Sequence, residues 1–165
     1  MKSKLLHYLK ESIKFILVMT IIANIISLYK SSSLNNKALT FSSARLLEDK
    51  NYIIDNSKPL LIHIWATWCP TCQVESSNIQ KISKQFQVIT IAVKSGSDND
   101  IQKYLDKNRL DFMVINDTNA SFAREFNIAA YPSTFVYNKN RELVFSDVGY
   151  TSTWGLWLRV WWAGL

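Results

Sequence analysis

The chain has 165 residues, of which 48% are hydrophobic, so it can form one compact domain with a core and an appendage. Its formal net charge is +6, but residues 1–30 hold five lysines and one glutamate, which leaves a net charge of only +2 for the other residues. No basic run interleaved with aromatic residues appears among them, which argues against nucleic-acid binding.

An uncharged, strongly apolar segment, Phe15–Tyr29, follows the first lysines. As a helix it would span about 22 Å, short of the roughly 30 Å hydrocarbon core of a bilayer. Ile13 and snorkelling by Lys14 and Lys30 bring it to the lower limit for a span. We therefore expect residues 1–30 to be a cytoplasmic tip and an uncleaved membrane anchor. A cleaved signal peptide and a buried soluble helix are the alternatives, although no small-x-small cleavage pattern follows the segment.

Residues 31–38 are polar and are expected to link the anchor to a domain over residues 39–165. Within this domain, strand-like and helix-like patterns alternate, which indicates an α/β fold with a mixed sheet covered by helices on both faces. Residues 39–58 are the least informative and could add one or two edge strands. In chain order, the patterns predict strands at 59–66, 87–93, 112–115, 133–137 and 142–148, and helices at 70–85, 97–108, 120–126 and 152–165.

Both cysteines of the chain, Cys69 and Cys72, stand at the first strand-to-helix junction, with Pro70 and Thr71 between them. Pro70 suits a first helical turn, because the N–H that it lacks has no partner there. Cys69 is then at the helix N-terminus, where unpaired N–H groups stabilise a thiolate and lower its pKa. A thiolate attacks disulfides, and Cys72 can resolve the mixed disulfide. The pair therefore predicts dithiol–disulfide exchange.

Three other interpretations of the cysteine pair have less support. A structural disulfide across so short a loop would constrain little of the unfolded chain. A zinc site would need further ligands, and the only histidines are His7 and His63. A c-type haem attachment signal would need histidine where Gln73 stands. No metal site is therefore predicted.

The run IWATWCPTC, residues 64–72, resembles the thioredoxin signature, and the likeness extends from about Leu60 to the C-terminus. The chain is most similar to the TlpA-like membrane-anchored protein disulfide oxidoreductases, and its ending GYTSTWGLWLRVWWAG resembles the ScsD-like type (suppressor for copper sensitivity D). The resemblance implies a thioredoxin fold, a redox-active Cys69–Cys72 disulfide and no cofactor. It also implies a periplasmic domain behind a single inner-membrane span, protein thiol or disulfide substrates, and a membrane thiol electron donor.

The resemblance assigns further site residues. Pro132 stands where the family has a cis-proline opposite the cysteines, which leaves the preceding backbone free to pair with a substrate peptide. Tyr131 directly precedes it. The implied substrate-binding residues are Tyr131 together with Trp68, Pro70 and Thr71. Trp65 is expected to pack beneath the site.

Two ionisable residues are candidates for proton transfer. Glu75 lies three residues after Cys72, where TlpA-like proteins often carry an acidic residue, and it is expected to tune the cysteine pair or relay protons to it. An exposed helix glutamate is the alternative. His63 occupies the place of the buried aspartate of thioredoxin. It is expected either to accept a proton from Cys72, with a pKa near working pH, or to be a hydrogen-bonded core residue.

The sequence thus predicts a membrane-anchored oxidoreductase that reduces disulfides in periplasmic partner proteins. A thiol-based protein that handles Cu(I) and a disulfide-donating oxidant are the alternatives, since Pro-Thr between the cysteines suits either direction of electron flow. Four tryptophans recur at helical spacing in residues 152–165. We expect them to cover the sheet, and contact with a bilayer interface is the alternative.

Overall fold

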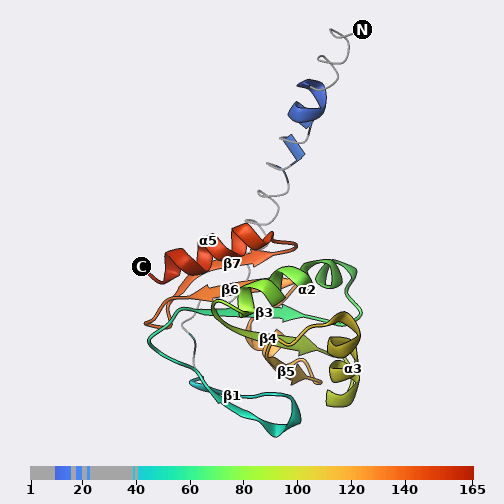
Figure 1. Cartoon of the computed structure of the whole chain (residues 1–165), viewed down its shortest axis with the longest axis vertical. Helices are drawn as coiled ribbons and strands as arrows, with labels where there is room; N and C mark the ends of the chain where they lie inside the picture. Colours follow the sequence, from blue (N-terminus) through green and yellow to red (C-terminus); the bar gives the residue numbers. More distant parts are fainter. Residues whose placement is uncertain (1–9, 16–17, 20–21, 23–38, 40) are drawn as a thin grey trace.

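The domain is built on a five-stranded mixed sheet with strand order β5-β4-β3-β6-β7, seen in a computed structural model (Figure 1). The structure describes residues 10–15, 18, 19, 22, 39 and 41–165. β3, β4 and β5 run parallel, and β6 and β7 are antiparallel to their neighbours. The strands are β3 (Leu60–Trp65), β4 (Gln87–Val93), β5 (Val114–Asp117), β6 (Ser133–Tyr137) and β7 (Leu143–Val148).

Helices cover both faces of this sheet, as expected. The parallel connections contain α2 and α3, and crossovers of one hand in one direction place their helices on the same face. The buried side chains of α2, α3 and α5 share one core cluster, and those of α4 belong to the cluster on the other face. The helices are α2 (Pro70–Ser83), α3 (Asp98–Asn108), α4 (Ser121–Glu125) and α5 (Thr153–Ala163).

The two central strands are buried at every position, which is why they appear in the sequence as nearly continuous apolar runs. Side chains alternate between the two faces. Leu61 and Trp65 of β3 lie in the core cluster beneath α2, and Ile62 and Ile64 lie in the cluster on the other face. The strand that carries the cysteine junction is therefore held in the middle of the core.

The apolar side chains of α2 do not all face the core. Ile79 and Ile82 are buried, but Val74 is 68% exposed. Positions three and four residues before Ile79 share its helical face, so Glu75 and Ser76 occupy the buried side. Two polar residues therefore lie on the buried face of α2, and one of them is the candidate site residue Glu75.

Two strand predictions also need correction. β5 begins two residues later than expected, because Leu110 and Phe112 are buried before the chain pairs with β4. Residues 39–58 do not extend the central sheet at its edge. They contain a separate antiparallel pair, β1 (Ser43–Arg45) and β2 (Asn51–Ile53), joined by the 3-10 helix η1 (Leu47–Asp49). Ala44 and Ile54 anchor this segment in the core cluster that includes α4.

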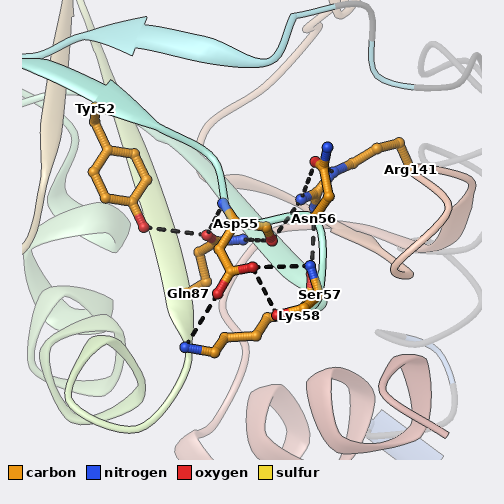
Figure 2. A network of polar contacts seen from close by, with 7 residues as sticks. All are labelled: Tyr52, Asp55, Asn56, Ser57, Lys58, Gln87 and Arg141. Atoms are coloured by element: carbon orange, nitrogen blue, oxygen red, sulfur yellow. Dashed lines mark hydrogen bonds and ion pairs between the residues drawn. The ribbon is translucent and has the colours of Figure 1, made fainter.

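A polar network joins the segment after β2 to the central sheet (Figure 2). Gln87, the first residue of β4, accepts hydrogen bonds from the Tyr52 hydroxyl (3.1 Å) and the Asp55 backbone N–H (2.8 Å). Arg141, from the β6–β7 connection, donates to the Asp55 carbonyl and to the Asn56 side chain, each at 2.8 Å. The network lies where β3 and β4 begin, at the opposite end of the sheet from the cysteines.

The predicted anchor lies mostly outside the described residues, and the predicted linker, residues 31–38, lies wholly outside them. The described residues of the anchor region are helical, and their side chains are exposed, including Ile13, Phe15 and Met19. Among the residues that the structure describes, no helix has the length and apolar character needed to cross a membrane.

Gln87→Ala should destabilise the domain by about 0.5–1.5 kcal/mol, because it removes the shared acceptor of two part-buried hydrogen bonds, from the Asp55 N–H and from the Tyr52 hydroxyl. Urea denaturation followed by circular dichroism measures the loss. Lys58→Ala is the matched control, since it removes only an exposed ion pair with Asp55. Equal free energies of unfolding for the Gln87 variant and the wild type would show that the network does not contribute to stability.

Candidate functional site

The site is built on the junction between β3 and α2. Cys69 is the N-cap residue of α2: its backbone is extended, and its sulfur accepts a hydrogen bond from the Cys72 N–H at 3.2 Å. Its own N–H donates to the Ala66 carbonyl at 3.2 Å, which closes the turn after the strand. Pro70 takes the first helical position, as predicted. The helix end therefore points its unpaired N–H groups at the sulfur of Cys69.

Cys69 and Cys72 are joined by a disulfide, with their Cα atoms 5.3 Å apart. The two sulfurs differ in access. Cys72 is 1% exposed and Cys69 is 6% exposed, and Pro70 and Thr71 between them are exposed. Cys69 is thus the outer residue of the pair and Cys72 the shielded one, which matches the order of attack and resolution that dithiol exchange requires.

An aromatic pair borders the disulfide. Trp68 is 56% exposed, and its indole N–H donates to the Lys94 carbonyl at 3.1 Å. Its ring meets that of Tyr131 edge to face, with centroids 5.5 Å apart. Tyr131 precedes Pro132 through a cis peptide bond, and Ser133, the next residue, pairs with Ile64 of β3. The register therefore places Trp68, Tyr131 and Pro132 at the end of β3 that carries the cysteines.

Glu75 is fully buried, so the alternative of an exposed helix glutamate was wrong. One carboxylate oxygen, Oε1, accepts the Thr151 N–H at 3.0 Å, and the other, Oε2, has no partner among the described residues. Burial raises the pKa of Glu75 to about 8, against the opposing effect of the Thr151 N–H, and the negative charge of Asp147 raises it further. Glu75 is on the same helical face as Cys72, one turn away. A proton acceptor of this pKa suits a thiol.

A clamp of hydrogen bonds holds the loop that contacts Glu75. Asn78, another buried polar residue of α2, donates to the Thr151 carbonyl and to the Tyr150 hydroxyl, each at 3.1 Å. It also accepts from the Thr153 hydroxyl at 2.9 Å. These contacts position the backbone N–H that serves Glu75, and they also hold the start of α5 against α2.

An ion pair between β7 and α5 stands near the same carboxyl. Arg159 donates to Asp147 at 2.7 Å, and both side chains are largely covered. Asp147 is the charge that acts on Glu75.

His63 lies on the face of the sheet that α2 covers, between Thr134 of β6 and Thr90 of β4. Its Nδ1 lies 3.0 Å from the Thr134 hydroxyl on β6, and its neighbour on β4 is Thr90, which accepts the indole N–H of Trp65 at 3.1 Å. Burial lowers the pKa of His63 to about 3, so its ring is neutral near neutral pH. Of its two expected roles, the geometry favours the hydrogen-bonded core residue. Trp65 is buried beneath the site, as expected.

Sequence reasoning missed Thr151, Asn78, Asp147 and Arg159. Thr151 acts through its backbone, so its identity carries no signal. Asn78 had one available signal: it falls on the face of α2 that Ile79 and Ile82 define, where a polar residue needs a partner. Among the described residues, no group of three or more His, Cys, Asp or Glu side chains could hold a metal ion.

A family comparison agrees with this geometry. The Redoxin family model matches residues 35–154. The chain belongs to the Redoxin family. Its strand order, helix placement and cysteine junction are those of a thioredoxin-fold domain.

Two curated relatives of this Redoxin chain have names that refer to thioredoxin or to thiol chemistry. A "Thioredoxin-like protein" of Haemophilus influenzae is 36% identical over 112 residues, 67% of this chain and 66% of the relative. A "Thiol:disulfide interchange protein DsbE" of Pasteurella multocida is 34% identical over 95 residues, 55% of this chain and 52% of the relative. The matched part thus spans about half to two thirds of these relatives.

A solved structure supports the fold. StoA from Bacillus subtilis superposes with a TM-score of 0.63, covering 77% of this chain and 98% of that one, at 18% identity. At that identity the likeness concerns the fold alone.

Glu75→Gln should change how stability depends on pH. The Glu75 carboxyl has a pKa of about 8 when folded and 4.5 ordinarily. Its protonated form therefore contributes stability that is complete below pH 4.5 and is lost as the pH rises toward 8. Each pH unit of that interval costs about 1.4 kcal/mol. Urea denaturation of the oxidised protein between about pH 5 and 7 should show the free energy of unfolding of the wild type falling, relative to that of the variant, at this rate.

The same substitution at the exposed Glu142 controls for the loss of a carboxylate elsewhere. Parallel stability curves for wild type and Glu75→Gln would mean that Glu75 titrates as it does in an unfolded chain.

Asn78→Ala should cost about 1–3 kcal/mol, because it breaks the clamp and leaves buried partners unpaired. It should also lower the pKa of Glu75, since a loosened loop admits water to the carboxyl. Carbon-13 NMR titration of the glutamate carboxyls measures this shift. Thr153→Val is the matched control, because it removes only the contact with Asn78 Oδ1. A Glu75 pKa equal to that of wild type would contradict the clamp.

Proposed function

We propose that this protein is a thiol–disulfide oxidoreductase that reduces disulfides in partner proteins. The observation that carries the proposal is the Cys69–Cys72 disulfide at the start of α2, with its outer sulfur beside the exposed Trp68. Relatives named thiol:disulfide interchange protein support it. Trp68, Tyr131, Pro70 and Thr71 would form the surface on which the partner peptide lies, with Pro132 behind it.

In the reductive direction, the thiolate of Cys69 attacks one sulfur of the partner disulfide. A Cys69–partner bond forms, the partner disulfide breaks, and the first partner sulfur leaves as a thiolate. Cys72 then loses its proton and attacks Cys69. The Cys69–Cys72 bond forms, the mixed disulfide breaks, and the second partner thiolate leaves. Two electrons have passed to the partner, and the enzyme holds the disulfide seen in this structure.

The ionised form of Glu75, which a pKa of about 8 makes the minor form at neutral pH, is the proposed acceptor for the proton of Cys72. Its buried carboxyl lies one helical turn from that thiol, and a pKa of about 8 is matched to a thiol proton. The buried Cys72 has little contact with solvent, so an internal acceptor has a clear use. His63 supports β3 and the neighbouring strands in this scheme and takes no part in the proton transfer.

The membrane setting is part of the proposal. The apolar segment Phe15–Tyr29 behind several lysines favours a single-pass anchor in the inner membrane, with residues 39–165 as the periplasmic domain. A reductase in an oxidising compartment must receive electrons, and a membrane thiol protein is the proposed donor. The ending GYTSTWGLWLRVWWAG supports the ScsD-like type within the family.

The reduction potential of the Cys69–Cys72 pair decides the direction of electron flow. The full chain in detergent is equilibrated with glutathione or dithiothreitol buffers, and free thiols are counted by alkylation and mass. We expect a potential near or below about −220 mV, in the range of glutaredoxin and thioredoxin. A value near about −120 mV, as for strong oxidants, would make the protein a disulfide donor. Cys72→Ser, which cannot close the disulfide, supplies the baseline.

A further inference from the structure

The outer face of α5 is apolar and exposed. Its large side chains are between 45% and 82% exposed and recur at spacings of three and four residues, so they lie on one helical face. We call this face the apolar stripe. It consists of Trp154, Leu158, Trp161 and Trp162 of α5 and of Leu165, which follows the end of the helix.

Three of the four tryptophans, Trp154, Trp161 and Trp162, therefore do not cover the sheet as expected, whereas Trp157 packs against the core. Smaller side chains do so instead: Leu156, Val160 and Ala163 are buried against the core. Trp157, half-buried at the margin, stacks on Trp161 with centroids 6.0 Å apart. The helix is thus apolar on opposite faces. When only one of two apolar faces of a helix is packed, the exposed face is expected to bind another apolar surface, such as a protein or a membrane.

The charges around the stripe suit an anionic surface. α5 carries no acidic residue, and its one basic residue, Arg159, is paired with Asp147. A hollow of about 300 Å³ beside Trp161 and Leu165 has Lys58 as its only charged lining residue among the described ones. Outside residues 1–30 the chain carries a formal net charge of +2. Anionic phospholipid head groups complement such a surface, and tryptophan favours the lipid–water boundary.

The path of the chain brings the same end of α5 toward the proposed anchor. Leu39, where the domain begins, donates its N–H to the Arg141 carbonyl at 3.1 Å. Arg141 in turn lies 3.4 Å from the Lys58 carbonyl, and Lys58 lines the hollow next to Trp161. The linker of residues 31–38 can span at most about 29 Å. A membrane anchor before it would hold the C-terminal end of α5 close to the bilayer.

We propose that the apolar stripe of α5 lies in the lipid–water interface of the membrane that the N-terminal segment enters. This proposal rests on the proposed anchor for the approach of the domain to the bilayer. Because α5 packs beside α2 through Asn78 and Thr153, docking would fix the direction that the disulfide faces relative to the membrane. A membrane thiol donor would then meet Cys69 in one defined orientation.

Tryptophan fluorescence in vesicles tests the proposal without labels. All six tryptophans of the chain fall between Trp65 and Trp162, so the N-terminal segment contributes none. The full chain is reconstituted into vesicles of phosphatidylcholine and phosphatidylglycerol, with or without bromine on the acyl chains. Bromine quenches indoles that enter the lipid. We expect brominated vesicles to quench the emission, since Trp154, Trp161 and Trp162 would be embedded.

Leu158→Lys combined with Leu165→Lys keeps every tryptophan and changes only exposed positions of the stripe. Quenching should be lost in this double variant and retained in Ile53→Lys, which alters an exposed apolar residue of β2 outside the stripe. An unchanged reduction potential would show that the double variant is folded. Quenching that persists in the double variant would overturn the proposal, because another face would then touch the lipid.

The outcomes separate the stripe from the anchor. Chain that resists extraction by alkaline carbonate but is not quenched would support the anchor and overturn the stripe. Quenched chain that carbonate releases would support the stripe and contradict the membrane span. Chain that neither binds vesicles nor is quenched would overturn both. A dimer in detergent that the double variant abolishes, with no quenching, would assign the stripe to a second copy of the chain.

Discussion

The site depends on one local contact, the hydrogen bond from the Cys72 N–H to the sulfur of Cys69 at the start of α2. It makes a cysteine the cap of the helix, so an N–H group that would otherwise lack a partner donates to a sulfur that can carry negative charge. Pro70 supports this arrangement because it supplies no N–H at the first helical position. The buried strand β3 in turn holds the junction in place, since each of its residues is covered.

Two buried ionisable residues lie in the core beneath and within α2, and burial has opposite consequences for them. Both are most stable uncharged: the pKa of His63 falls and that of Glu75 rises. A neutral histidine with a threonine partner is a satisfied core residue. A carboxyl with one orphan oxygen is not satisfied. The fold does not need this unpaired carboxyl oxygen of Glu75. Proton transfer from Cys72, one helical turn away, would use it.

The C-terminal helix links this chemistry to the proposed membrane setting. Its inner face completes the core through Leu156 and Val160, and its start is clamped to α2 by Asn78. Its outer face has no comparable use within the domain. One helix therefore holds the loop that serves Glu75 and also presents the apolar stripe. The orientation of the stripe and that of the disulfide are fixed by the same packing.

Local chemistry made much of the fold predictable. β4 was predicted to the residue, and β3 to within one residue at each end, because parallel strands buried on both faces have continuous apolar sequences. α3 followed from its capping residues, since Ser97 and Asp100 form a capping box. Most of the first 38 residues lie outside the part of the chain that the structure describes. For them, apolar length and flanking lysines remain the basis of prediction.

The amino-acid sequence by itself predicted the chemistry of this protein. The motif is local: it is a cysteine pair with a proline between the cysteines, directly after an apolar strand, so neighbouring residues are enough to recognise it. Tertiary structure alone decided which side chains are covered. Val74 is exposed while Glu75 is buried, and three tryptophans face outward while leucine and valine face the sheet. The physical reason is that burial depends on which distant segments meet. The Thr151 N–H reaches Glu75 across 76 positions of the chain, and no local pattern records that contact.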